Sequence, residues 1–147
     1  MILNLVKNES QKETEVRITY SVMDKTVRNI VSLVKSVDTQ LECYSGNTVN
    51  MINIYDIYYI ESIDKKTIVF CADGAFTVKN RLYQIYEKLS GNGFIQISKY
   101  CIININKLEK ITQMANSHLE AVLSSGKILY VTRKYLTGIK QALREGK

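Results

Sequence analysis

Residues 94–106 constrain the fold more than any other stretch of this chain. The segment Phe94-Ile-Gln-Ile-Ser-Lys-Tyr-Cys-Ile-Ile-Asn-Ile-Asn106 is largely apolar and is broken by a short polar step, Ser98-Lys99-Tyr100. A second basic step, Arg133-Lys134, follows about thirty residues later, where a strand-like run ends. An apolar frame with repeated basic steps suits a protein that holds a polyanion while a few side chains project past it.

From Thr48 onward the chain shows dense β signal divided by short turn signals. Apolar and β-branched runs predict strands over 50–54, 57–60, 67–72, 76–79, 108–112, 119–123 and 128–132. Asp73-Gly74 is typical of a tight hairpin. A helix is expected from a cap at Asn80 to Leu89, and a terminal helix over 134–144. This pattern predicts a mainly β fold with short helices and antiparallel sheets, in the α+β class, and not an α/β nucleotide fold.

The first 45 residues carry a different pattern. Glu15–Ser21 alternates polar and apolar residues and predicts a strand, and residues 39–45 predict another. Between them, Asp24 is a good N-cap for an amphipathic helix that runs to about Ser36. We therefore expect two parts: a strand–helix–strand extension over 1–45 and a second domain over 46–147. The extension is too small to stand alone, so it should pack on the rest or on a second copy, as a dimerisation or regulator-binding unit.

The formal net charge is +6, and it is unevenly distributed. Residues 1–45 hold six basic and six acidic residues, so residues 46–147 hold 20 − 6 = 14 basic and 14 − 6 = 8 acidic residues. The whole excess lies in the second part. Such asymmetry indicates an anionic partner there, most simply nucleic acid, while a basic but inert surface is the alternative.

Composition argues against several classes of function. Cys43, Cys71 and Cys101 are far apart and odd in number, so neither a disulfide framework nor a zinc spacing is present, and we interpret them as buried small hydrophobes. His118 is the only histidine and lacks partners for a metal or a catalytic triad. We expect no enzyme activity, no cofactor and no small-molecule substrate. Without a signal peptide or a long apolar run, a cytoplasmic location is expected.

Residues 48–147 resemble the LytTR DNA-binding domain. The resemblance rests on Ile57-Tyr-Tyr-Ile-Glu-Ser62, on the polar turn Asp64-Lys-Lys-Thr67, on Phe94 to Asn104 with its Ser-Lys step, and on Val131-Thr-Arg-Lys-Tyr135. Their order and spacing agree with the family over about a hundred residues. Tyr100 departs from the small residue that usually follows the basic one. The neutral start resembles the extension of stand-alone LytTR regulators and not a phosphoacceptor receiver.

The resemblance implies an elongated fold of small antiparallel β-sheets whose loops enter successive major grooves. It implies a transcriptional regulator that binds double-stranded DNA at direct-repeat sites, as a homodimer or as paired monomers. In some stand-alone members a small membrane protein encoded alongside restrains the regulator, which adds such a protein to the candidate partners.

Carried over by position, three places correspond to DNA contacts in the family: Lys65, Lys66 and Thr67; Ser98, Lys99 and Tyr100; and Arg133 and Lys134. Arginine offers a bidentate fork for a guanine edge, so Arg133 is expected on a base and Lys99 on a base or a nearby phosphate. The other lysines and the hydroxyl groups are expected mainly on phosphates. Thr67 is a weak base reader because its side chain is short.

Other interpretations remain open at this level. An ordinary solvated turn is the alternative for Lys65 and Lys66, and a cap or salt bridge within the last helix is the alternative for Arg133. A protein–protein interaction or signalling module with a passive basic surface is the rival function. RNA binding would require exposed aromatic residues ordered on a sheet. We expect Asn104 and Asn106 to satisfy backbone groups beside the apolar core.

Overall fold

The computed structural model describes residues 1–115 and 118–145, and in these residues ten strands and three α-helices form. The helices are α1 (Lys25–Val37), α2 (Leu82–Leu89) and α3 (Leu136–Glu145). The strands are β1 (Gln40–Ser45), β2 (Thr48–Asn53), β3 (Ile57–Ile63), β4 (Lys66–Cys71), β5 (Gly74–Val78), β6 (Phe94–Ser98), β7 (Cys101–Asn104), β8 (Leu108–Gln113), β9 (Leu119–Leu123) and β10 (Ile128–Val131).

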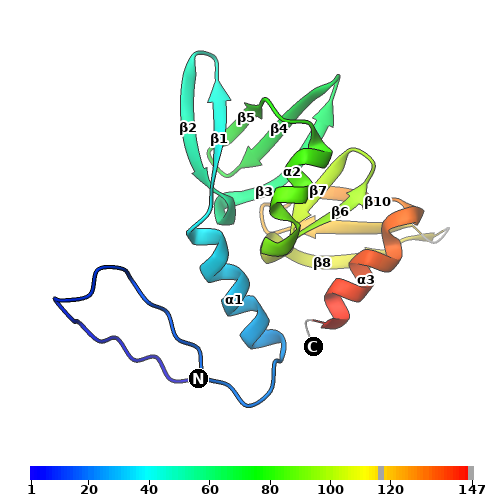
Figure 1. The fold of residues 1–147 in the computed structure, drawn as a ribbon. Coiled ribbons are helices and arrows are strands. Elements are labelled where there is room, and N and C mark those ends of the chain that lie inside the picture. The colour runs from blue at the N-terminus through cyan, green and yellow to red at the C-terminus, as the bar shows by residue number, and fades with distance from the viewer. Residues whose placement is uncertain (116–117, 146–147) are drawn as a thin grey trace.

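The strands form two antiparallel sheets. Seven strands lie in the order β2-β1-β5-β4-β3-β7-β6, and three lie in the order β10-β9-β8. Figure 1 shows α2 lying over the larger sheet, α3 beside the smaller one, and α1 below the β1–β2 hairpin. The expected mainly β, antiparallel fold with short helices is therefore confirmed.

The start of α1 follows the sequence prediction. The Asp24 carboxylate accepts a hydrogen bond from the Val27 backbone N–H at 3.0 Å and so satisfies one of the free donors of the first turn. The helix is amphipathic, but only Val27 and Ser36 are buried. Much of its apolar face therefore remains accessible in the single chain.

One prediction for the first 45 residues needs correction, and another is confirmed with an unexpected pairing. The strand expected over 15–21 does not form, and these residues have no regular secondary structure. An alternating sequence needs a neighbouring strand to complete its backbone hydrogen bonds, and the structure places none beside it. The expected strand at 39–45 does form as β1, but it pairs with β2 and β5, so the β1–β2 hairpin crosses the expected boundary at 45/46.

Two helix starts also differ from the prediction. The N-cap of α2 is Arg81 and not Asn80: the Arg81 backbone N–H donates to Gln84 Oε1 at 2.9 Å. The terminal helix begins at Leu136, since the 3₁₀ turn Arg133–Tyr135 precedes it. Both differences move a basic side chain to the junction between a strand and a helix.

The core is divided into two clusters by the larger sheet. One cluster packs the inner residues of α2 against β1, β3 and β4, with Ile54, Ile60 and Leu89 fully buried. The other fills the space between the two sheets and α3, around Ile97 and Ile139. Because these clusters are closely packed, they hold in place the strand ends that carry the basic turns.

Asn104 joins the end of β7 to the connection between β2 and β3. Its Nδ2 donates to the carbonyl oxygen of Ile57 at 2.8 Å, and at longer distances to those of Ile54 and Tyr55. Its Oδ1 accepts from the Asn106 backbone N–H at 3.0 Å. The side chain is fully buried, so the structural role expected for Asn104 is confirmed.

Candidate nucleic-acid interface

The basic segments found in the sequence meet at one place on the β scaffold. The Ser62 backbone N–H donates to the Tyr100 carbonyl oxygen at 2.8 Å, which joins the end of β3 to the turn after β6. On the other side, the Thr132 backbone N–H donates to the Ile97 carbonyl oxygen at 2.9 Å. The turn at 98–100 is therefore flanked by the β3–β4 turn and by the end of β10.

The β3–β4 turn presents its lysines in a special backbone conformation. Ile63 pairs with Lys66, so two residues form the loop, and both have positive φ: 50° at Asp64 and 66° at Lys65. This is the type I′ geometry that matches the twist of a hairpin. Lys65 and Lys66 are exposed, whereas Thr67 is only 5% exposed and lies at the floor of the site.

The β6–β7 turn projects a lysine and a tyrosine. The Tyr100 backbone N–H donates to Ser98 Oγ at 3.2 Å, which closes the turn and leaves the serine hydroxyl hydrogen available. Lys99 and Tyr100 are both exposed, and Lys99 Nζ lies 5.5 Å from the centre of the Tyr100 ring. The Tyr100 ring therefore lies close to the Lys99 ammonium group at the surface.

The third segment follows β10. The Tyr135 backbone N–H donates to the Thr132 carbonyl oxygen at 2.9 Å and closes a 3₁₀ turn that carries Arg133 and Lys134. Both side chains are exposed. Lys134 Nζ lies 5.7 Å from the centre of the Tyr135 ring. The chain leaves the sheet here, so both cations point outward from a strand end that is fixed to β6.

A cleft of about 730 Å³ connects the first two turns and adds a residue that the sequence interpretation missed. Arg81 is exposed and lies in this cleft, which is lined by Ser62, Asp64, Lys65, Thr67, Arg81, Leu82, Tyr83, Gln96, Lys99 and Tyr100. In the sequence, Arg81 stands between a predicted strand and a predicted helix, next to Asn80, which is the expected N-cap of that helix. Its proximity to Lys65 and Lys99 depends on the tertiary fold.

These cations lack acidic partners within the residues that the structure describes. The ion pairs resolved there are Lys7–Glu9 and Arg17–Glu15, both in the first 24 residues. Asp64 is the acidic residue among those that line the cleft. Since ion pairs do not neutralise the basic side chains, this surface carries a net positive potential that attracts an anion.

The three cysteines have thiols whose pKa values are raised by burial. Burial raises the pKa of Cys101 to about 12, with Glu61 adding to the rise and Lys127 opposing it. Burial likewise raises the pKa of Cys71 to about 12 and that of Cys43 to about 11. The thiols are therefore protonated at neutral pH and weakly nucleophilic. Across residues 1–115 and 118–145, no three His, Cys, Asp or Glu side chains gather as metal ligands would.

A mainly antiparallel β scaffold with unpaired cations on three adjoining strand ends is the surface of a polyanion-binding protein. Residues 47–144 match the family model described as the LytTr DNA-binding domain. Because this match covers well over half of the chain, the protein belongs to the LytTR family of DNA-binding transcriptional regulators, which are not enzymes.

Similar proteins support this assignment over nearly the whole chain. An uncharacterized HTH-type transcriptional regulator of Staphylococcus aureus (strain NCTC 8325) is 30% identical over 97% of this chain and 98% of its own length. The corresponding regulator of strain N315 shows the same identity and coverage. Residues 1–46, which lie outside the family match, are thus also represented in these relatives.

A solved structure supports the fold. The LytTr DNA-binding domain of a methyl-accepting/DNA response regulator from Bacillus cereus superimposes with a TM-score of 0.68 at 21% identity, covering 71% of this chain and 96% of that domain. In the described part of our chain, strands separate each α-helix from the next, so turns and not a helix-turn-helix present the basic side chains. None of the helices described here is long and apolar enough to cross a bilayer.

Proposed function

We propose that this regulator reads direct-repeat promoter sites in double-stranded DNA, with its basic turns in the major groove. The observation that carries the proposal is the pair of backbone hydrogen bonds, Ser62 to Tyr100 and Thr132 to Ile97, which hold three basic turns beside one another. Groups fixed on a rigid sheet can meet phosphates and base edges in register without ordering a loop first.

Within this surface the side chains have different tasks. Arg133 contacts a base edge, where its planar fork fits the two acceptors of guanine. Lys99 contacts a base or an adjacent phosphate. The remaining groups bind phosphates, with Arg81 added to those expected from the sequence: Lys65, Lys66, Ser98, Tyr100 and Lys134. Thr67 supports the first turn from beneath and does not reach a base, because its side chain is buried.

The test is a binding titration on the chain's own promoter and on a scrambled duplex at several salt concentrations. Arg133→Ala should cost about 1–3 kcal/mol on the promoter and reduce the preference over the scrambled duplex. Lys134→Ala should weaken binding to both duplexes alike and lower the salt slope by about one. Lys88→Ala is the matched control, because Lys88 is also exposed but lies at the opposite end of α2 from Arg81.

Two results would contradict the proposal. Unchanged affinity and selectivity for Arg133→Ala would exclude base reading by this residue. If the chain does not bind the promoter, or if its affinity does not depend on salt concentration, the rival function is favoured: a protein-interaction module with a passive basic surface.

Direct repeats require two copies of the domain on one site, as a homodimer or as paired monomers. We propose that two copies of the chain bind one DNA site together. A small membrane protein that restrains the regulator is a further candidate partner. A cytoplasmic location follows from its action on DNA. Footprinting upstream of the chain's own start would define the spacing of the repeats.

A further inference from the structure

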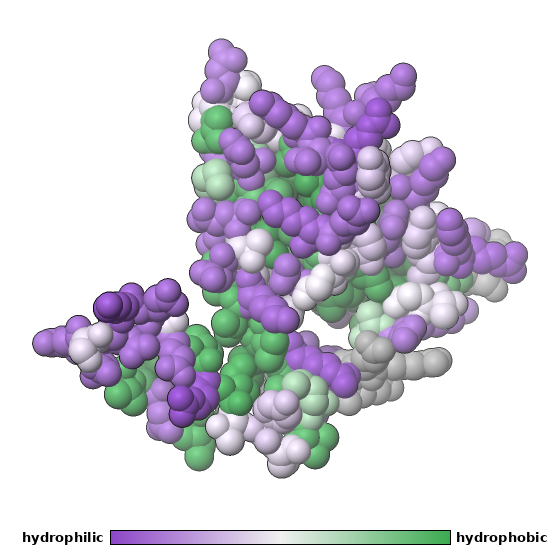
Figure 2. Space-filling view, viewed as in Figure 1, coloured by the Kyte–Doolittle hydropathy of each residue, from purple (hydrophilic) through white to green (hydrophobic). Residues whose placement is uncertain are grey.

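The N-terminal arm, residues 1–23, is an extended segment that makes few contacts. The hydrogen bonds and ion pairs resolved for it are local, such as those between Asn8 and Ser10 and between Glu15 and Arg17. Yet its apolar residues stand in solvent: Val16 is 56% exposed, Tyr20 50% and Val22 69%. Figure 2 shows hydrophobic residues exposed on the arm and along α1. A soluble protein rarely leaves so many apolar side chains uncovered.

The same segment has the pattern of a strand without a partner. From Val16 to Val22, apolar and polar residues alternate, so that a strand here would show one apolar and one polar face. Such a strand becomes stable when it adds to the open edge of a sheet, which supplies the missing backbone hydrogen bonds.

Strand β2 provides an edge of that kind. It is the terminal strand of the seven-stranded sheet, while the other terminal strand, β6, packs against α3 and β10. Val49 and Met51 on β2 are 51% and 56% exposed. They lie opposite Tyr44 and Glu42 of β1, on the face away from the buried Leu41 and Cys43. An apolar row at an unpaired edge is a template for strand addition.

The arm cannot place residues 15–22 along its own β2, because α1 holds the two apart. Helix α1 has 13 residues and therefore spans about 20 Å. Its C-terminal end leads into β1 beside β2, whereas the arm leaves its N-terminal end, as Figure 1 shows. Two residues, Met23 and Asp24, link Val22 to Lys25 and extend over about 10 Å at most.

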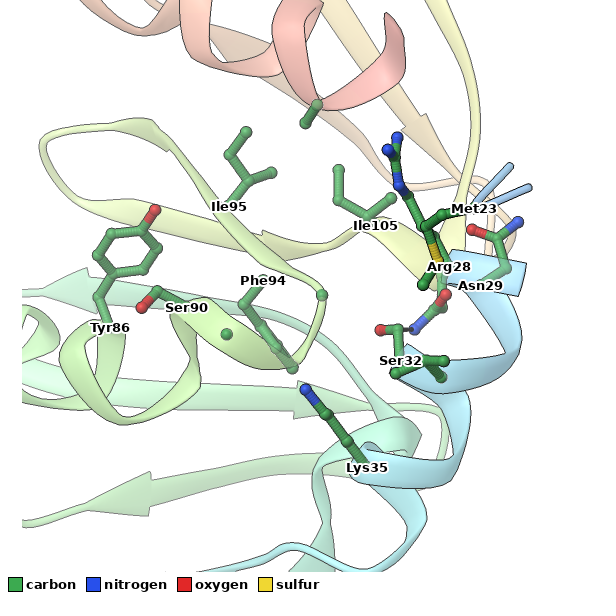
Figure 3. Close-up of a pocket in the computed structure, with 15 residues that line it drawn as sticks. Met23, Arg28, Asn29, Ser32, Lys35, Tyr86, Ser90, Phe94, Ile95 and Ile105 are labelled. Atoms are coloured by element: carbon green, nitrogen blue, oxygen red, sulfur yellow. Dashed lines mark hydrogen bonds between the residues drawn. The ribbon is translucent and has the colours of Figure 1, made fainter. Parts of the chain in front are cut away.

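Helix α1 is also held in place as a spacer. The Asn106 side-chain amide lies 3.4 Å from Ser32 Oγ, and Gly93 is so close that an added Cβ would lie 2.6 Å from the same oxygen. Figure 3 shows Ser32 and Lys35 on one side of a cleft and Tyr86 and Phe94 on the other. The helix thus keeps its direction relative to the sheet, and the distance between arm and β2 persists.

We propose that residues 15–22 of one copy add as a strand to the β2 edge of a second copy of this chain. The alternating residues Val16, Ile18, Tyr20 and Val22 then extend the apolar row formed by Val49 and Met51. The contact uses neither the basic turns nor DNA, so it can be tested on the free protein, and its failure would leave the proposed DNA reading intact.

The first experiment measures the dimer dissociation constant of the full chain by sedimentation velocity, without DNA. Tyr20→Pro removes a backbone donor from the arm strand and should raise this constant at least tenfold, while Lys12→Pro, outside the strand, should leave it unchanged. On the edge, Met51→Lys should raise it likewise. The matched control is Ile128→Lys, because Ile128 is 47% exposed on the edge strand β10 of the other sheet.

The second experiment identifies the contact by cross-linking. Tagged Val16→Cys, Ile18→Cys or Tyr20→Cys is mixed with untagged Met51→Cys, and a short bismaleimide is added. The native cysteines react slowly, because the pKa of each thiol is raised and little thiolate is present. A tagged–untagged product supports the proposal. Products between tagged copies alone indicate arm–arm pairing and overturn it. A monomer at all concentrations also overturns it and makes a different protein, such as a membrane regulator, the occupant of the arm.

Discussion

Lys65 has a strained backbone and is proposed to bind DNA, and replacing it with glycine should separate these two properties. Lys65 has a φ of 66°, which glycine adopts freely and lysine does not. A non-glycine residue held in this left-handed region costs about 1–2 kcal/mol. Glycine would remove that cost, so the substitution Lys65→Gly should stabilise the fold while it removes a charge that we propose binds a phosphate.

Lys65→Gly should change the stability of the fold and the affinity for DNA by different amounts. Relief of about 1–2 kcal/mol is offset by the greater chain entropy of glycine in the unfolded state, about 0.5–1 kcal/mol. The net gain therefore lies within about 0–1.5 kcal/mol and is centred on about 0.75 kcal/mol, which corresponds to a rise in melting temperature of about 3 °C for a chain of this size. For DNA, one lost phosphate contact lowers the salt slope by about 0.9, which amounts to about fivefold in affinity at 0.15 M salt.

Lys66→Gly is the matched control, because it removes the same charge one residue later. Lys66 lies in β4 and has no positive φ, so glycine there should lower stability by about 0.5–1 kcal/mol. Both variants should lose affinity, but their stabilities should change in opposite directions. Urea unfolding measures the stability, and titration of a labelled promoter duplex at three salt concentrations measures the affinity.

Two results would contradict this prediction for Lys65. If Lys65→Gly is as destabilised as Lys66→Gly, the left-handed turn does not strain lysine in solution. If Lys65→Gly keeps the affinity and salt slope of the unmodified chain, the turn is an ordinary solvated hairpin and does not contact phosphate.

Further perturbations test other parts of the structure. Asn104→Leu should lower the free energy of unfolding by about 2–4 kcal/mol in urea titrations, because it leaves buried carbonyl groups without their donor. Gly93→Ala should destabilise more than Gly126→Ala in thermal melts: both have positive φ, but only at Gly93 would the Cβ meet Ser32. Since the pKa of Cys101 is raised to about 12, the folded chain keeps a proton that the unfolded chain releases. Stability should therefore fall as pH rises above about 9, and less steeply in Cys101→Ala.

Local patterns in the sequence predict most of the helices and strands. Asp24 predicts the start of α1 because capping involves groups within one turn. Asp73-Gly74 predicts a hairpin between β4 and β5, and one forms there, although its two loop residues are Ala72 and Asp73, and Gly74 (φ 142°) pairs with Cys71. The segment at 94–106 divides at its polar step into β6 and β7, as its apolar frame indicates. Each of these depends on residues close together in the chain.

The remaining features depend on packing between residues that are far apart in the chain. The alternation over 15–21 indicates a strand, but a strand forms only where a neighbour supplies its hydrogen bonds, and α1 holds this segment away from the sheet. Arg81 was not singled out, because its proximity to Lys65 and Lys99 depends on where α2 docks. Thr67 is buried because it lies on the same face of β4 as Val69, which packs in the core cluster that includes α2. Local sequence patterns thus predict the strands from β1 onward and their basic turns, whereas the adjacency of those turns depends on strand order, which is set by packing between residues far apart in the chain.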